Sequence, residues 1–429
     1  MDIIEASIPL FFALIGVELL SAKRRRHQVY RLNDSVADLS CGILSQLTGI
    51  LLALMTYGIF AWIGARWSIQ HWTSLPAWPD GPPLASGANL AGWIVVFLLV
   101  DLCYYWSHRL SHEVNLLWAG HVVHHSSEEY NLTVALRQSS LHGLFTWVFY
   151  APLALLGVPW LMFAVCHGLN LIYQFWIHTR EIQRLGPLEW FMNTPSHHRV
   201  HHGVNPKYQD RNYAGVLIIW DRLFGSFTPE EEEPVYGITR PLGSWNPLWA
   251  NVHVFVEIFR AAWQTRRWRD KLKVIFGPPS WRPADLGGPV TIPEVRRATF
   301  RKFDPEIPAA IRRYTFVQFV VALLAAVALL RYARELTPLQ IGVVAFYITL
   351  TLSNLGSLLE GARWVGAMEV ARLATLVVTA GVLLAFPRFD SALVAAAGLF
   401  GIASITWYWR LSRARPLLAA GPGQMTPST

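Results

Sequence analysis

Long runs of apolar residues without charge constrain this chain more than any other feature. A helix that spans a membrane needs about 20 mostly apolar residues. Eight segments come close to that requirement, and they comprise residues 6–20, 37–65, 90–106, 141–177, 316–330, 339–358, 367–385 and 393–409. The segment at 141–177 holds no charge but is interrupted by Gly157 and Pro159, which favours a helical hairpin. The sequence therefore predicts an all-α integral membrane protein.

The composition agrees with a membrane protein and excludes several other classes. Hydrophobic residues make up 53% of the 429 residues and charged residues only 15%, against about 25% charged in soluble domains. Such a chain is neither disordered nor fibrous. The net charge of +8 favours a membrane surface as partner, and no nucleic-acid-binding module is visible. The three cysteines lie in apolar runs, which excludes a disulfide framework.

Basic residues near the apolar segments predict the orientation of the chain. Short cytoplasmic loops are enriched in lysine and arginine, and such clusters occur at residues 23–31 and 410–415. The polar, basic stretch at 180–312 is then cytoplasmic and forms a helical cap. The expected organisation is N-terminal membrane segments at 1–87, a metal-binding domain at 88–276, a linker at 277–313, a C-terminal membrane bundle at 314–415 and a disordered tail at 416–429.

Histidine is the residue type with the most informative pattern. Twelve of the 15 histidines fall between residues 108 and 202, within the motifs HRLSH (108–112), HVVHH (121–125) and HHRVHH (197–202) and at single positions. Residues three or four apart share one face of a helix, so such pairs can hold one metal ion between two imidazoles. Isolated histidines are more often packing or capping residues, which is the interpretation for His27, His71 and His253. His142 and His167 are interpreted as packing or channel residues.

The number of imidazoles predicts a site with two metal ions. Eight or nine exceed what one tetrahedral ion can bind, and the set contains no cysteine. Imidazole ligands suit iron, zinc, copper or nickel. A di-iron centre beside a membrane would use O₂ to oxidise a lipid C–H bond, whereas a dizinc centre would activate water for hydrolysis. A metal transporter is a third possibility, but its ligands should lie near the middle of the membrane rather than at one face.

The order of the histidine motifs resembles that of the fatty acid hydroxylase / sterol desaturase superfamily. The resemblance covers roughly residues 5–280 and is closest to members that cleave alkylglycerol ethers. It implies two iron ions, O₂ as co-substrate and nine ligands, with His197 as a tenth candidate; these are His108, His112, His121, His124, His125, His178, His198, His201 and His202. Gln174 stands where many members have a further histidine.

The same resemblance implies the reaction and its reductant. The ether-cleaving members imply hydroxylation of the ether-linked carbon, release of a fatty aldehyde and tetrahydrobiopterin as reductant. Other members imply hydroxylation or desaturation of a fatty acid or sterol, with electrons from a donor protein. The expected partners are therefore the lipid bilayer, a lipid substrate and an electron-donor protein in the second case.

Several polar residues near the motifs are further candidates. Asp101 lies within an apolar segment, where a carboxylate is costly unless paired, and Glu113 follows His112 directly. Both are candidates for catalytic or ligand-orienting roles, because carboxylates often fix ligating histidines. Residues that could contact the pterin or support the ligands are Glu128, Asn131, Arg137 and Gln138.

Overall fold

The computed structural model describes residues 3–73, 77, 78, 82, 83, 86–289, 291, 294–362, 364–386 and 390–414. In these ranges the regular elements are all helices, joined by turns and isolated bridges, which confirms the prediction of an all-α protein. The predicted tail at 416–429 lies outside the described residues. The chain divides into two compact units. The first unit comprises Met1–Leu242 and Ala250–Lys302, and the second comprises Gly243–Trp249 and Phe303–Thr429.

Six of the described helices are long and apolar enough to cross a membrane, and these are the helices over Ala6–Arg25, Gly87–Glu113, Ala309–Glu335, Pro338–Leu359, Val365–Leu383 and Ser391–Arg413. The chain is thus a multi-pass membrane protein. The count of eight segments and the cytoplasmic position of the cap stay predictions.

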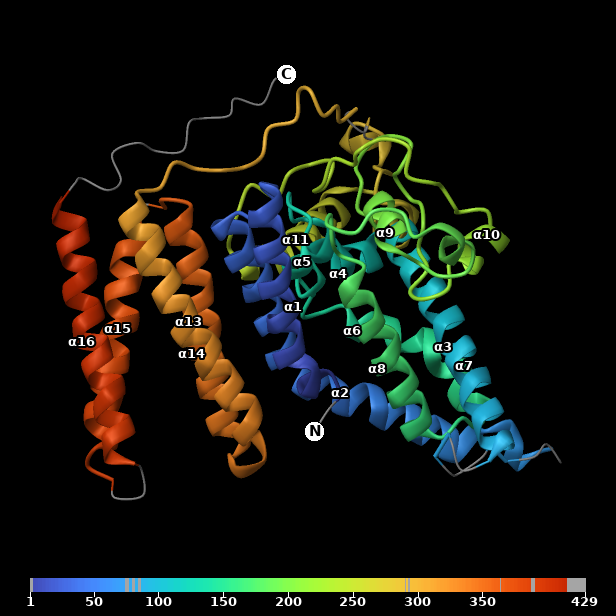
Figure 1. Cartoon of the computed structure of the whole chain (residues 1–429), viewed down its shortest axis with the longest axis horizontal. Coiled ribbons are helices and arrows are strands. Elements are labelled where there is room, and N and C mark those ends of the chain that lie inside the picture. Colours follow the sequence, from blue (N-terminus) through green and yellow to red (C-terminus); the bar gives the residue numbers. More distant parts are fainter. Residues whose placement is uncertain are drawn as a thin grey trace. The chain divides into compact units, whose positions relative to one another are not determined.

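Three helices of the first unit lie side by side (Figure 1). These are α1 (Ile3–Arg25), α3 (Gly87–Glu113) and α8 (Trp160–Trp176), and α8 packs against both of the others. Helix α3 begins where the side chain of Ser86 accepts a hydrogen bond from the backbone of Asn89, which satisfies one free donor of its first turn. The longest described helix is α2 (Leu32–Trp67), which packs against α7 and α8.

The predicted hairpin at 141–177 is present as two helical arms. The first arm is a series of short helices, α6 (Gly143–Thr146), η2 (Trp147–Tyr150) and α7 (Ala151–Leu155), and the second arm is α8. The turn between them places Gly157 at φ +76°, and a Cβ there would lie 2.5 Å from the side chain of Gln70. Only glycine fits both constraints. The rings of Phe60 and Phe163 stack at 4.3 Å in the core that α2 and α8 share.

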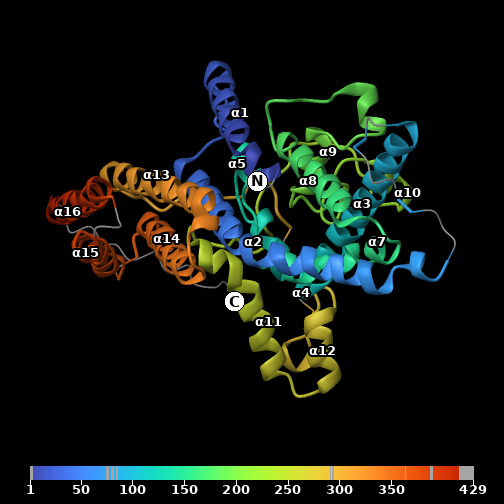
Figure 2. The same ribbon diagram turned by 90° about the horizontal axis from the view of Figure 1, so that it is seen from below.

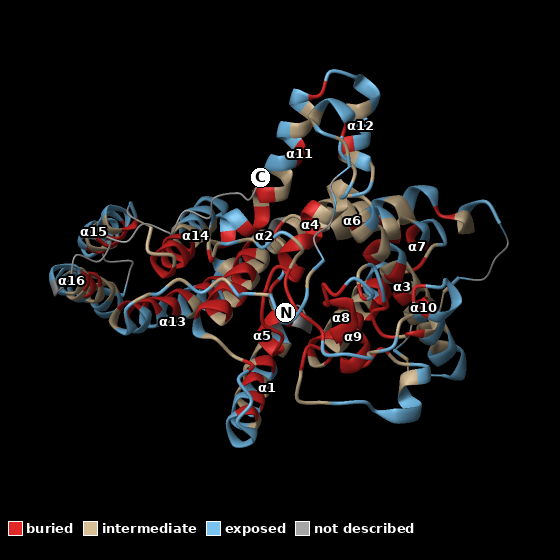
Figure 3. Ribbon diagram, turned by 90° about the horizontal axis from the view of Figure 1, so that it is seen from above, coloured by how far each residue is buried: buried red, intermediate tan, exposed pale blue. Residues whose placement is uncertain are grey.

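Shorter elements form the polar cap of the first unit. They are α4 (Asn115–His125), α5 (Leu132–Ala135), η3 (Gly186–Trp190), α9 (Pro195–His201), α10 (Ile219–Leu223), α12 (Trp268–Phe276) and η4 (Ala284–Leu286). The short helix η1 (Ile69–His71) lies instead beside the turn of the hairpin, where Gln70 approaches Gly157. Helix α11 (Pro247–Gln264) and α12 form a pair (Figure 2), and a small core joins them to α4. Every residue from Ala119 to His125 in α4 and from Pro195 to His201 in α9 is buried (Figure 3), and these stretches carry two of the histidine motifs.

The second unit is a bundle of four helices, α13 (Ala309–Tyr332), α14 (Pro338–Leu359), α15 (Val365–Leu383) and α16 (Ser391–Ala414), with η5 (Ala333–Glu335) after α13. A buried ion pair of Glu369 and Arg372 lies within α15, at 2.6 Å. Glu369 also accepts hydrogen bonds from Tyr314 and Asn354. Polar groups within such a bundle are stable only when paired in this way.

Candidate metal centre

Four segments deliver histidine side chains to one place in the cap. The last turns of α3 carry His108 and His112, α4 carries three histidines, His178 follows α8, and α9 with its C-cap carries four more. The structure gathers nine of these side chains into two groups that could each hold a metal ion. The first group is His108, His112, His121, His125 and His201, and the second is His124, His178, His198 and His202.

Each HxxHH motif divides its histidines between the two groups. His121 and His125, four residues apart, join the first group, whereas His124 joins the second. On α9 the assignment is reversed: His198 and His202 join the second group and His201 the first. Four residues turn a helix through about 400°, so the i,i+4 pair shares a direction that the i+3 residue does not.

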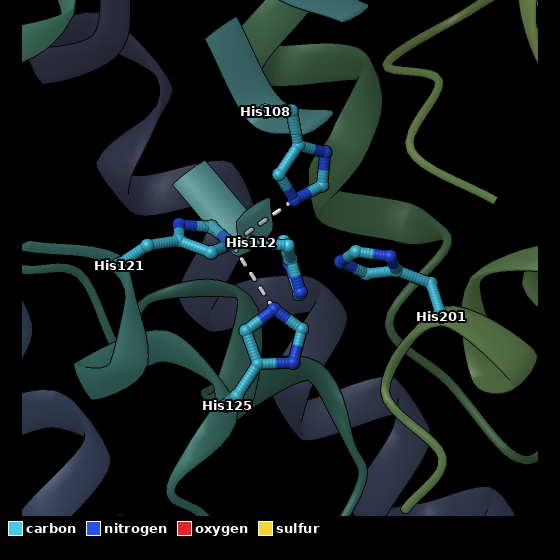
Figure 4. Close-up of side chains that lie close together, drawn as sticks. All are labelled: His108, His112, His121, His125 and His201. Atoms are coloured by element: carbon cyan, nitrogen blue, oxygen red, sulfur yellow. Dashed lines mark hydrogen bonds between the residues drawn. The ribbon is translucent and has the colours of Figure 1, made fainter. Parts of the chain in front are cut away.

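The nitrogen atoms in each group face a common centre. In the first group Nε2 of His121 lies 3.0 Å from Nε2 of both His108 and His125 (Figure 4). In the second group Nε2 of His178 lies 3.2 Å from Nε2 of His124 and 3.0 Å from Nε2 of His198. Two nitrogens bound at right angles to one ion, each at about 2.1 Å, would lie about 3.0 Å apart. The spacing therefore fits ligands around an ion.

Further nitrogens in the groups have no partner of their own. Nε2 of His112, His201 and His202 is buried and makes no hydrogen bond among the described residues. A buried polar atom without a partner is costly, so such atoms in a native site call for an explanation. A bound ion in each group would satisfy all three nitrogens.

Backbone carbonyls fix the orientation of four rings. In each case Nδ1 of the histidine donates to a backbone carbonyl. The pairs are His108 to Tyr213 (2.7 Å), His124 to Arg137 (3.1 Å), His178 to Gln174 (2.7 Å) and His201 to Arg211 (3.0 Å). A hydrogen bond at Nδ1 keeps the proton there and leaves the lone pair of Nε2 free for a metal. The rings are thus held ready for coordination.

The protonation state of the rings also suits a metal. Burial lowers the pKa of His124 to about 4 and lowers that of His125, His201 and His202 well below 6.5. Neighbouring imidazoles, which repel a second positive charge, add to the effect in the last three. Neutral imidazole is the form that binds metal, so the ligands are available at neutral pH.

The remaining candidates lie outside the two groups. His197 is buried beside the ring of Phe227, 5.4 Å away, and does not reach either group. Glu113 pairs with Arg109 at 2.9 Å and its side chain is 43% exposed. Asp101 is fully buried and accepts four hydrogen bonds, from the backbone of Val216 and Leu217 and from the side chains of Trp220 and Asn170.

The four residues predicted to contact a cofactor mostly support the frame of the site. Asn131 caps α5 and donates to the carbonyl of Val29. Arg137 is buried and binds Asp38, Ser126 and the carbonyl of Val123, which ties α5 to α4. Gln138 is exposed and donates to the carbonyl of Ala135. Glu128 is buried near Arg31, at 3.7 Å.

Two side chains near the ligands, those of His142 and Tyr104, make contacts that the spacing of residues along the sequence did not predict. His142, interpreted as a packing or channel residue, places Nε2 3.1 Å from Oγ of Ser111, with its ring 5.1 Å from that of His121. Tyr104 donates to the side chain of Gln174 at 2.6 Å, and Gln174 donates in turn to Asn170. Neither contact leaves a signal in the helical periodicity, because each joins separate helices.

Comparison with known proteins places this centre in a family. The model of the fatty acid hydroxylase family matches residues 93–226, the stretch that holds every ligand candidate. Alkylglycerol monooxygenases from Xenopus tropicalis and Homo sapiens are each 40% identical to the chain, over 86% of it and 80–81% of their own length. The chain belongs to the alkylglycerol monooxygenase family.

Membership of this family makes the chain an oxidoreductase that acts on a lipid, in a membrane environment. An ornithine lipid hydroxylase from Rhizobium tropici is 33% identical over a shorter stretch, 38% of this chain and 48% of its own length. No solved structure matches the chain. The resemblance read from the histidine motifs is thus confirmed, while the role of each residue stays a prediction.

Proposed function

We propose that the chain is a di-iron monooxygenase that uses O₂ to hydroxylate the ether-linked carbon of an alkylglycerol. The hemiacetal product would then separate into a fatty aldehyde and glycerol or a lysolipid. The observation that carries the proposal is the pair of all-imidazole groups in a chain of this family. Iron ions held there would activate O₂ for insertion into a C–H bond.

The choice of iron rests on the reaction. Imidazole ligands suit zinc as well as iron, but zinc has no redox chemistry of its own. A monooxygenase must deliver electrons to O₂, so a dizinc centre would not serve. The nine grouped histidines are the proposed ligands, with His197 outside them. Tetrahydrobiopterin is the proposed reductant, and an electron-donor protein is the alternative.

The proposed role of the protein is to position the lipid and the ligands. The site lies at the C-terminal ends of α3 and α8. Helix α3 is one of the helices long and apolar enough to cross a membrane. A lipid chain among these helices would bring its ether carbon to the level of the metal ions. We propose that this level is the cytoplasmic face, from the basic residues at 23–31.

The test uses purified full-length protein in lipid nanodiscs, loaded with iron. Aerobic incubation with an alkylglycerol and tetrahydrobiopterin should yield one fatty aldehyde per O₂ consumed, with about two irons per chain by metal analysis. Parallel incubations with a free fatty acid and a sterol test the other reactions of the superfamily. Active protein that contains only zinc, or turnover without O₂, would contradict the proposal.

A further inference from the structure

The pair of helices α11 and α12 carries apolar side chains on two different faces. One face of each helix packs in a small core with α4, where Ile258 and Val274 join Ala119. A second face of each helix points away from that core. Figure 2 shows that the pair, which belongs to the first unit from Ala250 onward, projects from the rest of that unit. The exposed apolar side chains are Val256, Phe259 and Trp263 on α11 and Trp268, Leu272 and Phe276 on α12.

The exposed apolar residues form one stripe on each helix. The three on α11 are spaced i, i+3, i+7, and the three on α12 are spaced i, i+4, i+8. Residues with such spacing lie along one face of a helix. Trp263 and Trp268 are each 77% exposed, although tryptophan is highly buried on average in folded proteins. A contiguous apolar surface of this kind marks a contact with another protein or with a membrane.

Basic side chains accompany the two apolar stripes. Residues 250–276 hold six lysines and arginines and two acidic residues, a net charge of +4. Arg266, Arg267 and Arg269 are exposed at the turn from α11 to α12. Clusters of four to eight basic residues on an amphipathic helix favour binding to anionic lipid. The charge therefore favours a lipid surface as the partner of the stripes, with aromatic residues at the level of the headgroups.

The anchoring of α12 places the pair beside the end of a membrane helix. The backbone N–H of Asn115 donates to the carbonyl of Gly277 at 2.9 Å, and the Asn115 side chain donates to the carbonyl of Val274 at 2.8 Å. Asn115 lies two residues after the end of α3, one of the helices long and apolar enough to cross a membrane. The pair is thus held at the level where α3 would leave the bilayer.

The turn between the two helices is fixed by hydrogen bonds. Nζ of Lys271 donates to the carbonyl of Ala262 at 2.7 Å, which satisfies an acceptor in the last turn of α11. Asp285 accepts from the hydroxyl of Thr265 at 2.9 Å and from the backbone of Arg266 at 3.0 Å. A surface that is already ordered loses less conformational entropy when it binds.

We propose that the α11–α12 pair is a monotopic membrane anchor that binds anionic phospholipid. Its two apolar stripes enter the headgroup region of the leaflet where α3 ends, and its arginines bind lipid phosphate groups. Because the pair packs on Ala119, two residues before His121, it holds α4 and its histidines at a fixed depth. Neither iron nor turnover is needed for this anchoring, so its test is independent of the proposed function.

The first test measures the depth of the pair in full-length protein, in nanodiscs of phosphatidylcholine and phosphatidylglycerol. A nitroxide is attached at Phe259→Cys or at Leu272→Cys, one site on each stripe. Electron paramagnetic resonance then compares its access to O₂ and to a water-soluble nickel chelate. Both labels should lie about 5–10 Å below the phosphate groups. Labelled wild type gives the background from the native cysteines, and Glu231→Cys, at an exposed position of the cap, should be open to the chelate.

Two results of this measurement would overturn the proposal. Free access of the nickel chelate to both labels would show that the stripes face water. Protection from both reagents would show that another protein, or a second copy of the chain, covers them. Two labelled sites with unchanged circular dichroism guard against a local folding defect in either variant.

The second test examines the requirement for anionic lipid. Each basic residue near an anionic surface strengthens binding about fivefold. The combined variant Arg266→Gln, Arg267→Gln and Arg269→Gln should therefore move the Leu272→Cys label toward water by about 5 Å. Nanodiscs of phosphatidylcholine alone should have the same effect on protein with its arginines intact.

The matched control replaces three exposed arginines outside the pair, Arg296→Gln, Arg297→Gln and Arg301→Gln. This variant should keep the label at its original depth, because these arginines lie on a later segment. Equal depth in both lipid mixtures and in all variants would overturn the proposal, since anionic headgroups would then play no part. An equal shift in the two arginine variants would also contradict it, because a general loss of charge would explain the result.

Discussion

Asp101 offers the sharpest test of how the fold positions the metal centre. Its Oδ1 accepts hydrogen bonds from the backbone of Val216 at 2.9 Å and from Asn170 at 2.6 Å. Its Oδ2 accepts from the backbone of Leu217 at 3.0 Å and from the indole of Trp220 at 2.9 Å. All four partners are donors, so a carboxylate satisfies them and an amide does not.

The segment that Asp101 holds leads directly to α9. The carbonyl of Val216 accepts a hydrogen bond from the backbone of Asn193 at 2.7 Å, two residues before α9 begins. Three of the nine grouped histidines lie on α9 and its C-cap. We therefore expect Asp101 to act as a positioning residue, through the backbone that aligns α9.

Asp101→Asn would replace one carboxylate oxygen, which accepts two hydrogen bonds, by an amide NH₂ group. That group is itself a donor and would face two other hydrogen-bond donors. Two hydrogen bonds to a charged group would be lost, at about 1.5–3 kcal/mol each, so the free energy of unfolding should fall by about 3–6 kcal/mol. Denaturant titration in detergent micelles, followed by tryptophan fluorescence, measures this change. Metal analysis of the same samples should show reduced iron content, because α9 loses its alignment.

Glu113→Gln is the matched control, since both carboxylates lie on α3 and were candidates for the same roles. Glu113 is half-exposed and has one ion pair, with Arg109. Exposed pairs contribute about 1 kcal/mol or less, so this variant should be nearly as stable as the wild type. Equal stability of the two variants would refute the reasoning from burial and hydrogen bonding.

Three further predictions follow from the site and the packing. His202→Ala should reduce the metal content from about two ions per chain to about one, because it opens the four-histidine group; metal analysis checks this, with the exposed His71→Ala expected to match the wild type. In metal-free protein, the pKa of His124 is about 4 when folded and 6.5 when unfolded, so the unfolded chain binds more protons and stability should fall as the pH drops from about 6.5 to 4; denaturant titration across that range would contradict this if stability rose. Gly42→Ala should destabilise the protein by about 1–3 kcal/mol, because its Cβ would lie 2.3 Å from a backbone oxygen, whereas Gly49→Ala on the same helix has nothing within 4 Å and should be tolerated.

The sequence was sufficient to predict the helical class, most membrane segments and the gathering of the histidine motifs into a cluster that could bind metal. Apolar length and helical spacing are local properties, and they can be read from neighbours in the chain. The roles of Asp101 and Arg137 could not be read in this way, because each depends on partners about 100 residues away. A cavity lined by Tyr236 was also hidden, since its wall comes from four separate segments, residues 26–29, 180–184, 199 and 230–236.

The helical spacing of the histidines also indicates which of the two groups each one joins, and the sequence interpretation did not use this information. In both HxxHH motifs the i,i+4 pair enters one group and the i+3 residue enters the other. His108 and His112 form a third such pair, which gives the first group five nitrogens. By the same rule His178 should pair with residue 174, but that residue is Gln174, and its amide is engaged by Tyr104 and Asn170. The second group therefore has four nitrogens, and the one departure from the repeated pattern leaves the two proposed ions unequally coordinated. An ion held by fewer imidazoles would keep a position for direct binding of a substrate, as catalytic metal sites do, and the four-histidine group is the one that would do so.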